Sequence, residues 1–225
     1  MKPFIIFFGP EGAGKTTQIR MLIKELQDKY GKQNVEVISI RDNHLLIPLV
    51  AKLLVRMGFF RYFSYGDGKI VKVADVQRVV RNKCLWSAFQ FLNLLPLIFV
   101  KYYVKRKLFR KLLIADRFIP DSICTLAHFM NNMNILDTRI GRLYLKLIPQ
   151  DAYLIFLFAP YEILVHRYKN RGSLVEPEDL IRYEITVGQM LVRLLHTRAL
   201  AINTATKTPE ETLRLIKKFL NKSIS

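Results

Sequence analysis

The hydrophobic positions of this chain fall into short continuous runs separated by longer segments with helical periodicity. Five short segments of four to six residues have the composition of strands. Four of them are continuously apolar, which is typical of strands buried on both faces of a parallel sheet, and the segment at 35–40 also contains Glu36 and Ser39. The five segments cover residues 4–8, 35–40, 112–115, 153–158 and 199–202. The pattern therefore predicts a sheet of five parallel strands.

Between these runs, apolar residues recur every three or four positions and predict helices. The predicted helices lie around residues 19–26, at 45–57, across about 70–110 in at least two pieces, at 121–134 and 138–147, from 161 to about 171, and at 178–198 and 209–221. Gly172 is expected to stop one helix and Thr208 to cap the last. An aromatic loop is expected at 58–68 and a short polar break at 173–177. Strands that alternate with helices predict a three-layer α/β fold with ligands at the carboxyl ends of the strands.

The 225 residues show no repeat, linker or low-complexity segment, so we expect one domain over residues 1–225. Within it, residues 45–111 are expected to form a helical region and about 170–178 a short lid.

The first strand runs directly into Gly9-Pro10-Glu11-Gly12-Ala13-Gly14-Lys15-Thr16-Thr17, which fits the phosphate-binding loop pattern G-x-x-x-x-G-K-[ST]. The glycines allow backbone N–H groups to approach phosphates, and the following helix presents the positive end of its dipole. Lys15 supplies a charge for the β- and γ-phosphates, and Thr16 a hydroxyl for Mg²⁺. This motif predicts that residues 9 and 12–17 bind ATP or GTP, in a five-stranded P-loop fold.

A second motif ends the third strand. Residues 112–116 form an apolar run that ends in the carboxylate of Asp116, followed by Arg117. In phosphate-loop enzymes such a carboxylate holds Mg²⁺ or its water, so we expect Thr16 and Asp116 to form a metal site. Arg41 and Asp42 follow the second strand and are expected on the same edge of the sheet.

Arg167 and Arg171 lie one helical turn apart and therefore share a face. They could clamp a transferring phosphoryl group, or they could belong to a solvated basic face.

The formal net charge of +18 indicates an acidic partner: phosphorylated substrates, nucleic acid or an anionic membrane surface. No nucleic-acid recognition motif is present, so nucleic acid is disfavoured. The two cysteines, Cys84 and Cys124, have no metal-like spacing, and we expect a reducing, cytoplasmic setting.

One segment is unusually apolar. Residues 84–100 carry no charge, and Lys101, Lys105, Arg106, Lys107, Arg110 and Lys111 follow. We interpret the segment as a buried helix kinked near Pro96. Two alternatives stay open: peripheral contact with an anionic membrane surface, and a homodimer interface.

The motifs resemble those of bacterial and archaeal thymidylate kinases. The resemblance is carried by residues 11–18, by Asp116-Arg117-Phe118 with Ser122, and by Ala159-Pro160 followed by Arg167 and Arg171-Gly172. It implies phosphoryl transfer from Mg·ATP to a nucleoside monophosphate such as dTMP, in a five-stranded fold with a lid, commonly in a homodimer.

The resemblance also implies individual roles. Lys15 and Thr16 would bind the ATP phosphates and the metal, and Asp116 would assist the metal and the acceptor phosphate. Arg117 would hold the acceptor phosphate. Arg167 and Arg171 would close over ATP. Glu11 takes the place of an acidic residue in the bacterial type, and residues 203–207 would lie at the edge of the adenine.

The acceptor half departs from the family pattern. Phe8 stands where the family has Glu, Arg41-Asp42-Asn43-His44 replaces Arg-Glu-Pro-Gly-Gly, and Gln90 stands where an Arg contacts thymidylate. Arg41, Asp42 and Gln90 are therefore candidate acceptor contacts with altered chemistry. Two other functions stay open: action on a different phosphorylated or lipid-associated acceptor at a membrane surface, and an ATP-binding regulatory module without turnover.

Overall fold

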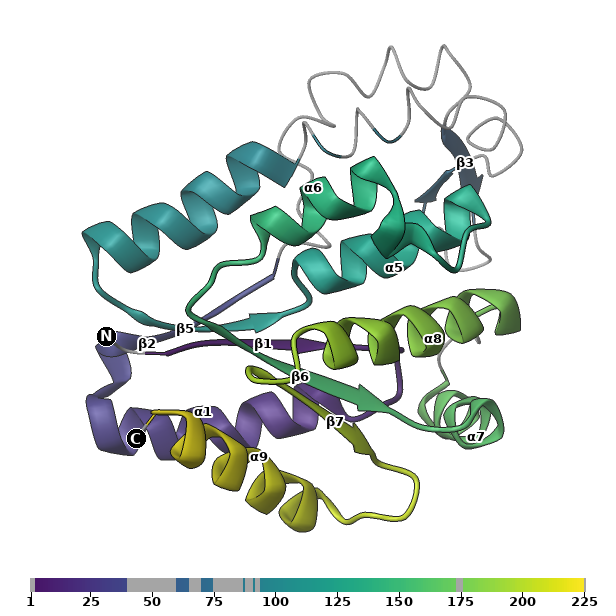
Figure 1. Cartoon of the computed structure of the whole chain (residues 1–225). Coiled ribbons are helices and arrows are strands. Elements are labelled where there is room, and N and C mark those ends of the chain that lie inside the picture. The colour runs from purple at the N-terminus through teal and green to yellow at the C-terminus, as the bar shows by residue number, and fades with distance from the viewer. Residues whose placement is uncertain are drawn as a thin grey trace.

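The computed structural model describes residues 3–39, 60–64, 70–74, 87, 91, 94–172 and 176–224. Its centre is a five-stranded parallel sheet in the order β2-β5-β1-β6-β7 (Figure 1). The strands are β1 (Phe4–Phe8), β2 (Val35–Ile38), β5 (Leu112–Asp116), β6 (Ala152–Phe158) and β7 (Ala199–Asn203). The five predicted strands are confirmed.

Helices cover both faces of the sheet, as Figure 1 shows. One face carries α1 (Lys15–Tyr30), α7 (Tyr161–Arg171) and α9 (Pro209–Ile224). The other carries α5 (Ile119–Met130), α6 (Arg139–Leu147), α8 (Glu178–Leu194) and the π-helical segment η2 (Phe99–Leu108). Short 3₁₀ turns lie at η1 (Lys32–Asn34) and η3 (Ile135–Asp137). The three-layer α/β arrangement is therefore as predicted.

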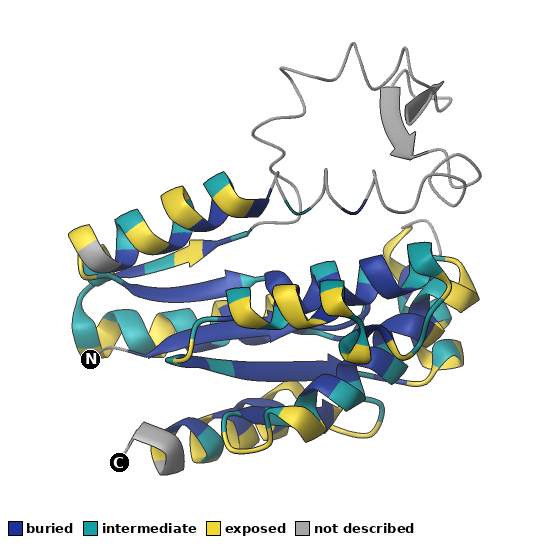
Figure 2. Cartoon of the chain, turned by 45° about the horizontal axis from the view of Figure 1, so that its top comes forward, coloured by how far each residue is buried: buried dark blue, intermediate teal, exposed yellow. Residues whose placement is uncertain are grey.

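The central strand β1 shows why its sequence is a continuous apolar run. Phe4, Ile6 and Phe8 pack into the core beneath α5 and α8, whereas Ile5 and Phe7 pack into the core beneath α1 and α9. Successive side chains point to opposite faces of a strand, so a strand covered on both faces must be apolar at every position. All five residues are buried, and the burial map in Figure 2 shows the same for the sheet interior.

Two expectations about residues 58–74 are wrong. Residues 60–64 are not an irregular loop but the strand β3 (Phe60–Ser64), and the helix expected from residue 70 is the strand β4 (Ile70–Ala74). The two pair antiparallel, with Phe60 opposite Ala74, in a separate two-stranded sheet. Both segments are rich in aromatic or β-branched residues, which favour strands, and a short apolar run is ambiguous between the two structures until its partner is known. The helix predicted at 45–57 lies outside the described residues.

Several predicted ends differ by a few residues. β2 ends at Ile38 rather than residue 40, α5 runs from 119 to 130 rather than 121 to 134, and α8 ends at 194 rather than 198. The predicted caps are confirmed. Gly172 ends α7 in the left-handed conformation, and Thr208 caps α9 through a bond from the Glu211 N–H to its Oγ1, at 3.2 Å.

The apolar segment before β5 is a helix on the sheet where it is described. Leu94, Leu97, Ile98 and Tyr102 are buried in the core shared with β1 and α5. In the described part of the chain, no helix has the length and apolar character needed to cross a membrane.

Candidate active site

The strand order brings the two sequence motifs together. β1 pairs with β5 on one side and β6 on the other, and Phe7 of β1 lies opposite Asp116 of β5. The phosphate loop and the Asp116–Arg117 pair therefore emerge from neighbouring strands at the same edge of the sheet. This is the edge at which parallel α/β sheets bind ligands.

The loop itself depends on glycine at its entry and exit. Gly9 has φ +122°, and a Cβ there would lie 2.1 Å from the carbonyl oxygen of Leu157. Gly14 has φ +95° and precedes the first turn of α1. Both conformations are unfavourable for residues with a side chain, so only glycine adopts them without strain. The two glycines therefore allow the loop to turn back over β1 and to lead into the start of α1.

Lys15 is held beneath the loop that precedes it. Its Nζ donates to the carbonyl oxygens of Gly9 at 2.6 Å and Pro10 at 2.7 Å, and the residue is buried. These bonds satisfy the ammonium group while the loop is closed around it. The same group can turn to an anion that enters the loop.

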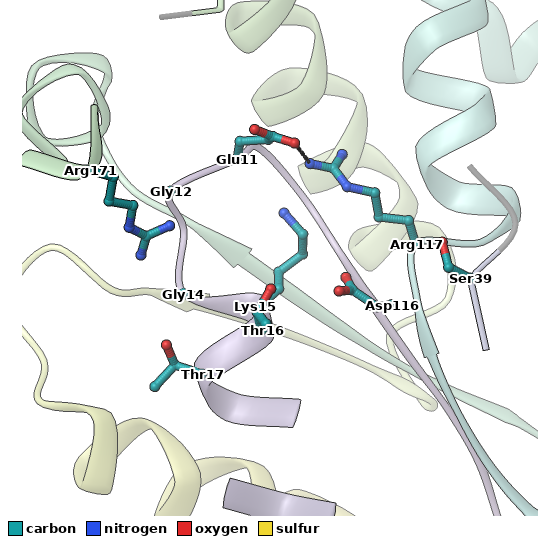
Figure 3. Close-up of a pocket in the computed structure, with 10 residues that line it drawn as sticks. All are labelled: Glu11, Gly12, Gly14, Lys15, Thr16, Thr17, Ser39, Asp116, Arg117 and Arg171. Atoms are coloured by element: carbon teal, nitrogen blue, oxygen red, sulfur yellow. Dashed lines mark hydrogen bonds and ion pairs between the residues drawn. The ribbon is translucent and has the colours of Figure 1, made fainter. Parts of the chain in front are cut away.

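A cavity of about 280 Å³ lies in front of the loop (Figure 3). Its lining joins the loop to the end of β5 and to the last residue of α7. The lining residues are Glu11, Gly12, Gly14, Lys15, Thr16, Thr17, Ser39, Asp116, Arg117 and Arg171. Figure 3 shows Asp116 and Arg117 on one side of the loop and Arg171 on the other. The cavity thus combines the phosphate loop with three cations, Lys15, Arg117 and Arg171, and two carboxylates, Glu11 and Asp116.

A second cavity, of about 220 Å³, adjoins the first through residues that both share: Gly12, Gly14, Thr17 and Arg171. The rest of its lining comes from the phosphate loop, α1, α7, α9 and the segment between β7 and α9, with Arg167, Thr204 and Lys207 among them. The two cavities together make a path from the loop toward the end of β7.

Arg117 lies among three carboxylates. Its Nη2 lies 3.0 Å from Glu11 Oε1, and its Nη1 lies 3.4 Å from Asp121 Oδ1 and 4.0 Å from Glu184 Oε1. Asp121 and Glu184 are almost fully buried, whereas about half of the Glu11 side chain is exposed. The two buried carboxylates fix the guanidinium from behind, and the partner on the solvent side is the one that an incoming anion can displace.

The backbone of Arg117 is strained. Its φ is +67°, in the left-handed region that costs an ordinary residue roughly 1 kcal/mol. Its N–H donates to the carbonyl of Phe7 at 3.0 Å, which ties the turn to β1. Strain of this kind persists where surrounding contacts enforce it and is common at functional sites.

Thr16, at the end of the phosphate loop, and Asp116, at the end of β5, both line the first cavity. A hydroxyl and a carboxylate are hard oxygen ligands of the type that Mg²⁺ takes, with nucleotide phosphates and water as its other ligands. Among the described residues, no three His, Cys, Asp or Glu side chains cluster in a way that would hold a metal by themselves. The donor set therefore fits a magnesium ion that arrives with a nucleotide.

Arg167 is bonded inside the protein. Its Nη1 donates to the Gly12 carbonyl at 3.0 Å and to Thr204 Oγ1 at 3.1 Å, and its Nη2 donates to the Thr204 carbonyl at 2.7 Å. Arg171, one turn later, is exposed and lines both cavities. Burial and the neighbouring charge of Arg171 lower the pKa of the Arg167 guanidinium. Two close cations beside the loop favour binding of an anion.

The predicted site residues divide into two groups. Those of the phosphate loop, with Asp116, Arg117, Arg167 and Arg171, come together around the two cavities. Arg41, Asp42 and Gln90 lie outside the described residues. The structure adds Ser39, the first residue after β2, as a lining residue of the first cavity and Gln18 as a lining residue of the second.

Sequence reasoning also missed Asp121 and Glu184, the two buried carboxylates beside Arg117. Asp121 stands four residues after Arg117, and that spacing could have indicated a pair on one helical turn. Glu184 is an acidic residue among the buried positions Tyr183, Val187 and Leu191 of α8. A charged residue on an apolar helix face is a signal that it has a charged neighbour.

Comparison with known proteins gives a likeness in structure. No family model matches the chain, and no curated protein matches its sequence. Among solved structures, the thymidylate kinase from Ehrlichia chaffeensis is similar to this chain, with a TM-score of 0.58 and 19% identity over 98% of both chains. The chain has the three-layer P-loop fold. At this identity, the likeness carries the fold alone.

Proposed function

We propose that this protein is an ATP-dependent phosphotransferase that phosphorylates a nucleoside monophosphate, with dTMP as the first candidate acceptor. The observation that carries the proposal is the first cavity, whose lining combines Lys15, Thr16 and Asp116 with Arg117 and Arg171. Such a set matches a reaction in which the protein positions two phosphate groups and neutralises their charge. The fold shared with a thymidylate kinase supports it.

In this proposal, the loop N–H groups and Lys15 bind the β- and γ-phosphates of ATP, and the adenosine extends into the second cavity past Thr204 and Lys207. Mg²⁺, held by Thr16 and Asp116, would neutralise phosphate charge. Arg117 would bind the acceptor phosphate, which would replace the Glu11 carboxylate as the partner of the Arg117 guanidinium. Arg171 would contact the phosphoryl group from the side opposite Arg117.

The acceptor is the open part of the proposal. The sequence replaces the family's acceptor motif with Arg41-Asp42-Asn43-His44 and places Gln90 where the family has an arginine. An amide in place of a guanidinium removes a charge but keeps hydrogen-bond donors. The base or sugar of the acceptor can therefore differ from thymidylate while the phosphate chemistry stays the same.

The test is ADP release from Mg·ATP with dTMP, dUMP, UMP, CMP, AMP and GMP. Lys15→Ala is expected to abolish turnover, a loss of about 1,000-fold or more, because the charge that neutralises the transferring phosphate is gone. Lys24→Ala, an exposed lysine of the same helix, is the matched control and should keep full activity. Turnover that survives Lys15→Ala would contradict the proposal.

The same panel separates the alternatives. ATP binding without ADP release on any acceptor would indicate a regulatory module. Release only when a phosphorylated lipid is added would indicate a lipid-associated acceptor. We further propose a cytoplasmic protein that forms a homodimer, which light scattering would test.

A further inference from the structure

The exposed large hydrophobic residues of this protein are concentrated in one segment. Eleven are found among the residues whose side chains the structure describes, and six of these lie between residues 95 and 109. They form what we call the apolar face: Leu95, Phe99, Val100, Tyr103, Leu108 and Phe109. Single exposed apolar side chains are ordinary, but a contiguous group marks a binding surface.

The apolar face has helical order. Leu95, Phe99 and Tyr103 are four residues apart, and the rings of Phe99 and Tyr103 stack with centroids 6.4 Å apart. The opposite side of the same helix buries Leu97 and Tyr102 in the core. Figure 2 shows the exposed positions on the side of this helix that is turned away from the sheet. A helix that is apolar on both sides needs a second apolar environment in addition to the core.

Basic residues predominate in the segment that carries the apolar face. Residues 94–115 contain no Asp or Glu, and their basic residues are Lys101, Lys105, Arg106, Lys107, Arg110 and Lys111. Lys105 and Lys111 share a single carboxylate, that of Glu36. Arg106 pairs with Asp151, and Arg110 is exposed. Positive charge therefore exceeds negative charge beside the apolar face.

We propose that the apolar face docks on an anionic lipid surface, with Leu95, Phe99 and Tyr103 in the headgroup region and the accessible basic side chains beside it on the lipid headgroups. These are Arg110 and the partly exposed lysines Lys101, Lys105 and Lys111. Aromatic and aliphatic side chains with flanking Lys and Arg are the combination that binds such a surface. A second copy of this chain fits less well. A two-fold contact would place the same basic residues near their own copies, where they repel.

The docked protein keeps its cavities open, because no residue of the apolar face lines either of them. The attachment is therefore separate from the proposed phosphotransfer. Flotation of the protein with vesicles requires no turnover, so failure of one proposal leaves the other intact.

The experiment is flotation of the full chain with phosphatidylcholine vesicles that contain about 30% phosphatidylserine, compared with phosphatidylcholine alone, at physiological salt. The test variant is Leu95→Gln/Phe99→Gln/Tyr103→Gln. The matched control is Leu143→Gln/Leu194→Gln/Leu215→Gln, three exposed leucines on α6, α8 and α9. Thermal unfolding and ADP release on soluble nucleotides check that each variant is folded.

We expect the wild type and the control variant to float with the anionic vesicles and not with phosphatidylcholine alone. The fraction of the test variant bound to the anionic vesicles should be at least about tenfold lower than that of the wild type, because three apolar side chains no longer enter the headgroup region. The proposal is overturned by a folded wild type that does not float, by equal binding to both vesicle types, or by a test variant that floats like the wild type. A wild-type dimer that the test variant turns into a monomer, without flotation of either, would assign the face to self-association.

Discussion

Arg167 and Thr204 are joined by two hydrogen bonds, although they come from α7 and from the end of β7. The Arg167 guanidinium reaches both the carbonyl and the Oγ1 of Thr204, at 2.7 and 3.1 Å, and it also reaches the Gly12 carbonyl. The Thr204 hydroxyl lies 3.1 Å from the Ala13 carbonyl as well. The shape of the phosphate loop therefore depends on contacts from α7 and from the residue that follows β7.

A first prediction concerns this contact. Thr204→Val keeps the shape of the side chain but removes its hydroxyl, and Thr204 is buried, so the loop loses a bond that water cannot replace. We expect the KM for ATP to rise about tenfold, which corresponds to the free energy lost with one buried hydrogen bond. The KM for the acceptor should stay unchanged. Steady-state kinetics with each substrate varied provides the measurement, and Thr186→Val in α8 is the control. A rise confined to the acceptor KM would count against this role.

A second prediction separates the two substrates. Arg117→Ala removes the cation that faces the first cavity from β5 and should raise the acceptor KM by about 100-fold, with a much smaller change for ATP. Arg117→Lys should recover part of the loss, because an ammonium keeps the charge without the forked geometry. Arg171→Ala is the comparison and should affect ATP at least as strongly as the acceptor. Equal effects of Arg117→Ala on both apparent affinities would remove the assignment of Arg117 to the acceptor.

A third prediction concerns the packing of α8 on β6. A Cβ on Gly188 would lie 2.5 Å from two ring carbons of Phe156, which is fully buried. The Phe156 ring is itself packed against Phe8 and Phe158, at centroid distances of 4.9 and 5.3 Å, so it cannot move aside freely. Gly188→Ala should lower the free energy of unfolding by about 2 kcal/mol. Urea unfolding measures it, with Gln189→Ala in the same helix as control. An unchanged or raised stability would show that the helix can shift.

A fourth prediction concerns pH. Burial raises the pKa of Glu36, but its hydrogen bonds with Lys105 and Lys111 outweigh this effect, and the net result is a pKa below the ordinary value of 4.5. A carboxyl whose pKa is lower in the folded state stabilises the fold above its unfolded pKa and loses that contribution as the pH falls through the folded value. Glu36→Gln should therefore be less stable than the wild type at pH 7, and the difference should shrink below pH 4.5.

The measurement is the urea midpoint between pH 3 and 7, about the range in which carboxyl groups titrate. Glu25→Gln is the control, because the pair of Glu25 with Lys217 is nearly half exposed on both sides and should contribute little. A Glu36→Gln variant whose deficit is the same at every pH would place the effect in packing and not in the charge.

The sequence determined those features that depend on neighbours along the chain. β1, β6 and residues 112–115 of β5 are continuous apolar runs because these strands are covered on both faces. The phosphate loop can be recognised from the sequence because its glycines, Lys15 and Thr16 lie within nine consecutive residues. The Thr208 cap can be recognised for the same reason, because the unpaired N–H groups at the start of a helix bond to residues within one turn of it.

Only the tertiary structure decided which distant residues meet. The order β2-β5-β1-β6-β7 is not the order of the chain. It places Arg117 beside Glu11, and the packing of α8 brings Glu184 to Arg117. The strands at 60–64 and 70–74 were missed for the same reason, since a short apolar run acquires its structure from the partner that supplies its hydrogen bonds. Local pattern fixes the conformation of a segment, whereas pairing between segments far apart depends on burial and hydrogen bonding across the whole fold.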